Sequence, residues 1–300
     1  MLLPLGPIRF RRSLLGGTGA NAPRTSGSAS STGYLATTND GALLSFTAHN
    51  SDITSGNANT ILLRGVGTLD ASGSFLLQTT YTGISGNQTR GTTSLNNIDW
   101  FIGDQGGVYT NGATAPSPSG NFRCIKSFGG TAYIFQASAT AQPVSTISAP
   151  VEGVITPLAG LAAASSNNQD FYLISSGNNG NAFDVLYILS ATSATAGTIS
   201  KFSMVDDSWT ANGTYTTSFG GFRLAAAGNG SGALLYVTTG TGSAAGNSVI
   251  KLVDTAGHNS TININTADNV TLYTAPAAAT PVSLIRCAQR IHRLAQTRLR

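Results

Sequence analysis

Short apolar runs separated by clusters of Gly, Asn, Asp and Ser recur along the chain from residue 33 onward. Such runs, bounded by turn-forming residues, are typical of β-strands joined by turns. The stretch Gly221 to Gly257 shows the unit most clearly, because apolar segments at 222–224, 234–237 and 249–253 alternate with glycine-rich loops. Helical periodicity is confined to the last fifteen residues. The pattern therefore predicts an all-β protein.

The unit repeats about every fifty residues. Tyr187 and Tyr236 occupy equivalent places 49 residues apart, and Lys201 and Lys251 stand 50 residues apart. The segment 33–279 contains 247 residues, which divides into five units of about 49 residues, the length of a four-stranded propeller blade. A β-solenoid is the competing fold, but its coils would repeat at about half this period or less.

The repeats predict a β-propeller of about six four-stranded blades with an incomplete closing blade. We expect an N-terminal arm over 1–32 that is disordered or altered, the propeller over 33–287, and a basic C-terminal tail over 288–300. The expected units are 33–83, 87–118, 120–160, 168–217 and 219–278, with a partial sixth unit at 281–287.

Two of these units are irregular. The second is the shortest, and we expect its outer strand to be missing or merged into the loop near Pro116 and Pro118. The sixth has only a first strand, because closed propellers commonly assemble one blade from both chain ends and residues 1–32 do not clearly supply the missing strands.

The formal net charge of +4 and the isoelectric point near 9.2 come from the two ends of the chain. Nine of the 16 basic residues lie before residue 25 or after residue 285, so the body between them has seven basic and twelve acidic residues. Nucleic-acid binding needs a basic face on the folded domain, and the body lacks this excess. Charged residues make up only 9% of the chain, but 41% are hydrophobic, which predicts folding rather than disorder.

No transmembrane helix is predicted, since no window of the sequence approaches eighteen consecutive apolar residues. The arginine-rich, acid-free start superficially resembles an organellar transit peptide more than a secretory signal. The tail 289–300 could form a basic amphipathic helix on an anionic surface, with a disordered or non-native tail as the alternative. Cys124 and Cys287 leave disulfide pairing open.

The turn motifs carry a family resemblance. The sequence LDASG at 69–73, IKLVD at 250–254 and the glycine-rich outer loops resemble those of secreted bacterial Gly/Ser/Thr-rich β-propeller proteins of unassigned function. The resemblance covers Tyr34 to Arg286 and implies an extracellular or cell-surface location. In that group a signal peptide and the remaining strands of the last blade would stand at the N-terminus. The arginine-rich start and the basic tail depart from this pattern.

An arginine recurs in the first strand of successive units, as Arg90, Arg123, Arg223 and Arg286. The first strand of each blade lines the central channel of a propeller, so these side chains should lie at an equivalent height. Converging guanidinium groups would attract an anion, because arginine presents a rigid fork of donors suited to carboxylate or phosphate. The alternative is that each arginine is a structural tie to a backbone carbonyl or to an aspartate of a neighbouring blade.

Three aromatic positions bear on the same site. Tyr34 (or its neighbour Leu35) and Tyr172 should occupy the channel positions in the two units without an arginine. Most other aromatic residues stand within apolar strands, which favours packing between blades over sugar binding. Trp209 is the exception: we place it in a loop, where it would be an exposed ligand contact.

No catalytic, metal or cofactor site is predicted. His49, His258 and His292 stand at no triad or metal-ligand spacing, and Asp206 and Asp207 are interpreted as turn residues. A calcium site at this aspartate pair would need six to eight oxygen ligands.

The sequence thus favours a non-enzymatic extracellular or surface module for binding or scaffolding, with an anionic small molecule or a carbohydrate as ligand at the channel mouth. A hydrolase built around the channel arginines is one alternative, and it requires a carboxylate or histidine within hydrogen-bonding reach of them. A purely structural protein that associates edge to edge through an open ring is the other.

Overall fold

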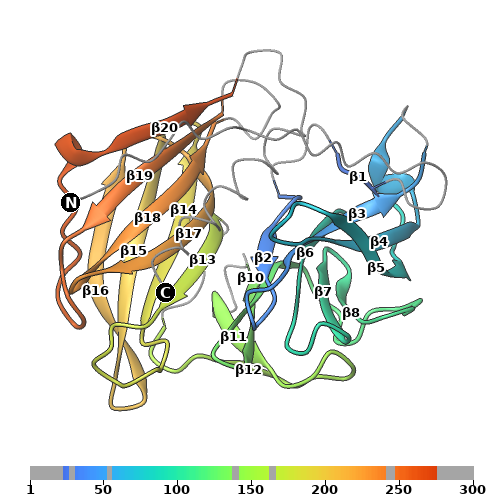
Figure 1. The fold of residues 1–300 in the computed structure, drawn as a ribbon, viewed down its shortest axis with the longest axis horizontal. Coiled ribbons are helices and arrows are strands. Elements are labelled where there is room, and N and C mark those ends of the chain that lie inside the picture. The colour runs from blue at the N-terminus through green and yellow to red at the C-terminus, as the bar shows by residue number, and fades with distance from the viewer. Residues whose placement is uncertain are drawn as a thin grey trace.

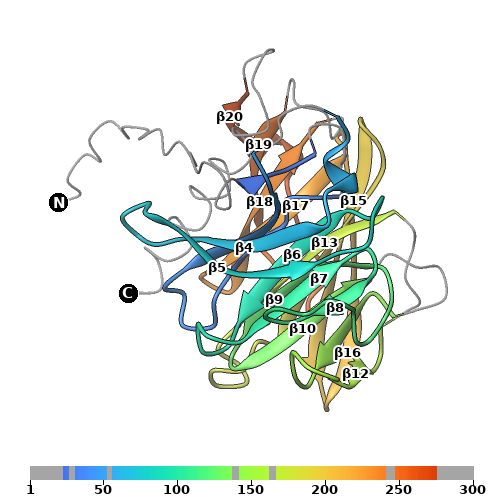
Figure 2. The ribbon, with the colours of Figure 1, turned by 90° about the vertical axis from the view of Figure 1, so that its right-hand side faces the viewer.

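In the computed structural model, residues 23–26, 31–52, 56–136, 142–161, 167–240 and 247–275 are described, and they form five antiparallel sheets, here called A to E in chain order. Figure 1 shows sheets D and E at the left and sheets A to C at the right, and Figure 2 gives the perpendicular view. Neighbouring strands of a sheet are mostly consecutive in the chain, as in propeller blades.

Sheet A contains β1 (Pro23–Arg24), β2 (Leu35–Thr37), β3 (Leu44–Asn50), β4 (Leu63–Leu69) and β5 (Phe75–Thr82). Sheet B contains β6 (Thr89–Ser94), β7 (Trp100–Asp104) and β8 (Gly107–Tyr109). Sheet C contains β9 (Phe122–Phe128), β10 (Thr131–Gln136), β11 (Val144–Ile147) and β12 (Ile155–Pro157). Sheet D contains β13 (Asn168–Ile174), β14 (Val185–Ser193), β15 (Ala196–Val205) and β16 (Ser208–Thr217). Sheet E contains β17 (Gly221–Asn229), β18 (Gly232–Thr239), β19 (Ser248–Asp254) and β20 (Val270–Thr274). Two short 3-10 turns, η2 (Ala58–Thr60) and η3 (Thr266–Asp268), lie in connecting loops.

Side-chain chemistry along each strand matches its place in the sheet. The second strand of sheet E, β18, is buried along its whole length. Leu235 and Val237 pack in a cluster shared with sheet D, and Leu234 and Tyr236 pack in a cluster formed by sheet E itself. The third strand of sheet D, β15, alternates buried and partly buried residues, as expected where one face is covered. The outermost strand β16 is rich in Thr, Asn and Gly and is largely exposed. Burial therefore decreases from the inner strands to the outer ones.

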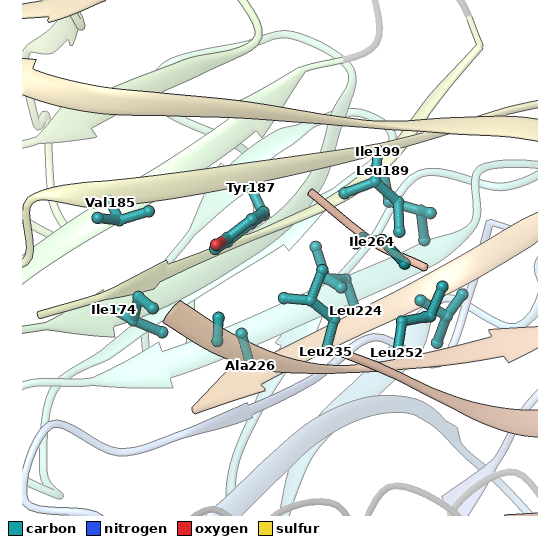
Figure 3. Close-up of a cluster of buried hydrophobic side chains, with 12 residues drawn as sticks. Ile174, Val185, Tyr187, Leu189, Ile199, Leu224, Ala226, Leu235, Leu252 and Ile264 are labelled. Atoms are coloured by element: carbon teal, nitrogen blue, oxygen red, sulfur yellow. The ribbon is translucent and has the colours of Figure 1, made fainter. Parts of the chain in front are cut away.

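A separate apolar cluster fills each interface between successive sheets. Figure 3 shows the one between sheets D and E, where Tyr187 and Leu189 of sheet D face Leu224, Leu235 and Leu252 of sheet E. The other three clusters join sheet A to B, B to C and C to D, and they centre on Trp100, Ile125 and Phe171 respectively. The core is thus divided into layers between blades.

One strand of each sheet lies beside its counterpart in the next sheet: β2 beside β6, β6 beside β9, β9 beside β13 and β13 beside β17. We call these the inner strands. Arg223 of sheet E donates a hydrogen bond to the backbone carbonyl of Thr32, in the segment that precedes β2 of sheet A. The predicted all-β propeller is confirmed. The partial sixth unit at 281–287 and the tail at 288–300 lie outside the described residues. Within the described ranges, no helix is long and apolar enough to cross a membrane.

Buried ion pairs also join neighbouring sheets. They connect Arg64 to Asp104 between sheets A and B, Lys126 to Asp170 between C and D, and Lys201 to Asp254 between D and E. The hydroxyl groups of Tyr81 and Tyr187 donate to the carboxylates of Asp104 and Asp254 respectively. Loss of either member would leave an uncompensated buried charge, which is strongly destabilising.

The outer edge of sheet B is covered by the proline-containing loop. The amide of Val108 on β8 donates to the carbonyl of Pro118, and the amide of Ser117 donates to the carbonyl of Val108. Gly107 allows this close approach, because its φ is 147° and an added Cβ would lie 2.5 Å from the Pro118 carbonyl oxygen. The sequence analysis left open whether the outer strand is missing or merged into this loop, and the structure has three strands in sheet B with the loop bonded along β8.

Part of the expected N-terminal arm belongs to sheet A. Pro23 and Arg24 form β1 and pair with Asn50 and His49 at the far end of β3, while β2 pairs with the beginning of β3. These two residues therefore extend sheet A, which differs from the separate arm that the sequence suggested. Residues 1–22 and 27–30 lie outside the described ranges.

Candidate functional site

Two of the inner strands carry a β-bulge near their beginning. On β9, Phe122 and Cys124 pair with consecutive residues of β10, so Arg123 is an extra residue in the ladder. On β13, Asn168 and Asp170 likewise pair with consecutive residues of β14, and Gln169 is the extra residue. A bulge bends the strand and redirects a side chain out of the regular pleat.

The other two arginines stand at similar irregularities. The register of β6 against β7 shifts between Thr89 and Thr92, a segment that includes Arg90. The register of β17 shifts between Gly221 and Arg223, so Arg223 directly follows the extra residue. Four inner strands are thus irregular near their N-terminal ends, where the polar side chains gather. Arg286 lies outside the described residues.

Tyr34 stands at the meeting point of these strands and is almost fully buried. The guanidinium carbon of Arg223 lies 3.6 Å from the centre of its ring, and its hydroxyl group donates to the carbonyl of Gln169 at 3.0 Å. Gly91 on β6 leaves room for it: an added Cβ would lie 3.0 Å from the Tyr34 Cβ and 3.3 Å from the Cys124 Cα. Tyr34 therefore fills the centre, and Arg223 stacks on it in a cation–π contact.

Arg90, Arg123 and Arg223 lie around the same tyrosine. The amide of Tyr34 donates to the carbonyl of Arg90, Gln169 accepts from both the Tyr34 hydroxyl group and Arg123, and Arg223 stacks on the ring. Burial raises the pKa of Tyr34, and the positive charges of Arg223, Arg123 and Arg90 partly oppose this rise. Burial also lowers the pKa of Arg90 to about 10, and Arg123 and Arg223 add to that lowering. Arg123 and Arg223 therefore each repel Arg90 across a poorly solvated centre.

Among the described residues, the hydrogen-bond acceptors of Arg90 and Arg123 are neutral. Arg90 is 4% exposed and donates to the carbonyl of Ser31 and to Asn121 Oδ1, while its buried Nε has no acceptor among the described residues. Arg123 donates from Nη1 to Gln169 Oε1 at 3.3 Å.

Arg223 donates to the carbonyls of Phe222 and Thr32. The ion pairs formed between described residues include neither Arg90 nor Arg123. The site therefore combines the predicted ties to backbone carbonyls with a concentration of positive charge.

An ion-paired layer follows immediately along the same strands. Asp170 accepts from Lys126 Nζ at 2.8 Å, from the backbone amide of Leu224 at 2.9 Å and from the thiol of Cys124 at 3.3 Å. Lys126 also donates to the carbonyls of Phe171 and Leu224. One buried pair thus connects sheets C, D and E.

Cys124 is a free and fully buried cysteine. Burial raises the pKa of its thiol well above the usual range, and the negative charge of Asp170 raises it further. The thiol is therefore protonated and inaccessible, which is the environment of a structural cysteine. Cys287 lies outside the described residues.

The two remaining predicted contacts lie elsewhere. Trp209 is 3% exposed and belongs to β16, where it packs into the core between sheets C and D, so the expectation of an exposed loop contact is wrong. Tyr172 packs edge-on against Phe128 and beneath Lys126. Gln169, rather than Tyr172, contacts the arginines. The sequence analysis also did not predict the contact of Asn121 with Arg90. An amide two residues before an arginine is too common a pattern to indicate a site.

No metal or acid–base constellation accompanies the arginines. Within the described ranges, no group of three or more His, Cys, Asp or Glu side chains could hold a metal ion. Asp206 and Asp207 form the turn between β15 and β16, with φ values of 49° and 60°. His49 bonds to Ile61 and Asn59, and the ring of His258 bonds to the carbonyl of Met204.

Comparison with known proteins identifies no family. No family model matches the chain, and no curated protein matches its sequence. Among solved structures, hydrazine synthase of Kuenenia stuttgartiensis is similar with a TM-score of 0.45 and 8% identity, over 91% of this chain and 72% of that one. The periplasmic gluconolactonase of Pseudomonas aeruginosa has a TM-score of 0.43 and 13% identity, over 83% of this chain and 86% of that one. Similarity this low assigns no activity to the chain.

Proposed function

We propose that this protein is a non-enzymatic β-propeller that binds an anionic ligand at Arg90, Arg123 and Arg223. The observation that supports the proposal is the convergence of these arginines around Tyr34, together with the neutral acceptors of Arg90 and Arg123. Like charges that share a poorly solvated site raise its free energy, and a bound anion would remove that cost. We call these three arginines the arginine cluster.

The hydrogen bonds of the Asp170 carboxylate favour a binding function over hydrolysis. A hydrolase would need a carboxylate or histidine that is free to exchange protons beside the arginine cluster. Asp170 follows Gln169 directly, but its carboxylate is 2% exposed and is occupied by Lys126, by the amide of Leu224 and by Cys124. A carboxylate held in this way contributes to stability and is poorly placed to act as a general base.

The proposal includes a place of action outside the cell or at its surface, as a binding or scaffolding module. Its support is the composition: charged residues make up only 9% of the chain, so most of the surface is solvated by hydroxyl and amide groups. The resemblance to secreted bacterial propellers points the same way. Immunodetection of the tagged protein in culture medium, surface and cell fractions tests this part, and retention of all the protein inside cells would overturn it.

Calorimetric titration with citrate, sulfate and inorganic phosphate at low ionic strength tests anion binding. We expect exothermic binding that weakens with added salt, because screening reduces the attraction between charges. Arg123→Gln should remove it, whereas Lys251→Gln, on the third strand of sheet E, removes the same charge away from the cluster and should not. Absence of binding by all three anions, or an equal loss in both variants, would contradict the proposal.

A further inference from the structure

The three guanidinium groups differ in how many of their donors are already occupied. Both Nη atoms of Arg90 donate to protein acceptors, and so do both Nη atoms of Arg223. Arg123 makes a single bond, from Nη1 to Gln169 Oε1, and that bond is long at 3.3 Å. In the described part of the chain, its Nε and Nη2 have no acceptor, and the side chain is only partly buried. Arg123 therefore retains the edge of the guanidinium that pairs with a planar carboxylate through two parallel hydrogen bonds.

Neutral amides surround this open edge. Asn121 is exposed, stands two residues before Arg123, and uses its Oδ1 to accept from Arg90. Its Nδ2 has no acceptor among the described residues. Gln169 Oε1 accepts from Arg123, and Gln169 Nε2 donates to the carbonyl of Asn167. Amide side chains beside a cation suit a ligand that carries hydroxyl groups next to its negative charge, because amides both donate to and accept from hydroxyl oxygens.

We infer that the ligand is a carboxylated sugar, such as a uronate unit of an acidic glycan, with Arg123 as the direct contact of the carboxylate and Asn121 as a contact of a neighbouring hydroxyl group. Arg90 and Arg223 are positioning residues: their carbonyl partners hold them in place, and they contribute positive potential. This inference rests on the proposed anion-binding function and adds the chemical class of the ligand.

The test compares three probes at one ionic strength: an oligomer of galacturonic acid, the matching neutral galactose oligomer, and inorganic phosphate. We expect the uronate oligomer to bind most tightly and the neutral oligomer to bind weakly or not at all. Arg123→Lys keeps the charge but loses the fork, so it should weaken uronate binding at least about tenfold. Asn121→Ala should weaken uronate binding while leaving phosphate binding unchanged. Lys251→Gln is the matched control, and unchanged melting temperatures show that each variant is folded.

The outcomes separate this inference from the proposed function. If phosphate binds as tightly as the uronate oligomer, or if Arg123→Lys keeps full affinity, the carboxylate class is wrong although anion binding stands. If none of the probes binds the wild-type protein, both the inference and the proposed function fail. A loss of uronate binding in Arg123→Lys and in Asn121→Ala, with phosphate binding kept in Asn121→Ala, supports both.

Discussion

Lys126 and Asp170 form a buried ion pair. Replacing Asp170 with asparagine removes the negative charge of this pair while keeping the shape of the side chain. The carboxylate is 2% exposed and accepts from Lys126 Nζ, from the amides of Leu224 and Phe171 and from the Cys124 thiol. After the change, the ammonium group of Lys126 stays buried without a counter-charge. Its remaining partners are two backbone carbonyls and the rings of Phe171 and Tyr172.

The size of the loss follows from these contacts. Breaking a buried ion pair by removing one partner typically costs about 3–5 kcal/mol. The two carbonyl acceptors and the aromatic faces, whose centres lie 5.5 and 5.2 Å from Lys126 Nζ, offset part of this cost. We therefore expect a loss of about 3 kcal/mol in the free energy of unfolding. For a slope of about 3 kcal/mol per molar urea, the midpoint falls by about 1 M.

Urea denaturation followed by circular dichroism measures this change. Asp207→Asn is the control, because it makes the same substitution in an exposed turn whose φ of 60° suits asparagine. In Lys126→Met/Asp170→Asn the uncompensated charge is gone, so the double variant should lose less than the two single variants together. A loss below about 1 kcal/mol in Asp170→Asn, or additive losses in the double variant, would refute the reasoning.

Three further predictions concern other positions. Gly91→Ala should lower the free energy of unfolding, measured by urea denaturation, by about 1–3 kcal/mol, because the added Cβ would press on Tyr34. Gly228→Ala is the control: the nearest atom to its added Cβ lies 3.8 Å away, so it should cost little or stabilise slightly. Equal effects of the two substitutions would contradict the packing argument. Burial lowers the pKa of His49 below 6.5, so the folded state binds fewer protons than the unfolded state, and the stability should fall as the pH falls below about 6.5. The urea midpoints at pH 7 and pH 5 should therefore differ less in His49→Gln than in the wild-type protein. An equal difference between the two midpoints in both proteins would count against this. Because both tryptophans, Trp100 and Trp209, are buried, native fluorescence should resist quenching by acrylamide until urea unfolds the protein. Strong quenching of native Trp100→Phe, in which Trp209 is the remaining tryptophan, would show that Trp209 is accessible.

The blade architecture could be predicted from the sequence because each unit repeats the same apolar runs and glycine turns at a nearly constant spacing. Inner and middle strands require apolar residues, so the repeat directly reflects burial. The pairing of β1 with β3 could not be predicted, since two residues carry no periodicity. Trp209 was misplaced for a related reason. The two-residue turn at Asp206 and Asp207 ends one position before β16, so the tryptophan already stands in a strand and points inward.

Arg90, Arg123 and Arg223 could be predicted as a group because each lies near the beginning of an inner strand. The residues around them could not be predicted, because the sequence does not indicate where a β-bulge inserts an extra residue into a strand. The apolar run from Phe171 to Ile174 suggested that Tyr172 faces the channel, but β13 begins at Asn168 and its bulge presents Gln169 instead. The neutral partners of the arginines were also unpredictable, since Ser31 and Asn121 come close only through tertiary packing.

The proline-containing loop of sheet B has a consequence for how copies of the protein can meet. An outer strand normally offers a row of free amides and carbonyls to which another chain can add a strand. Beside β8, that position is occupied by Ser117 and Pro118 of the same chain, and Pro116 and Pro118 have no amide hydrogen to donate further outward. A second molecule could extend this sheet only by first removing the loop. Growth of fibrils or open chains of molecules is therefore blocked at this blade, and any such assembly has to begin at another outer strand.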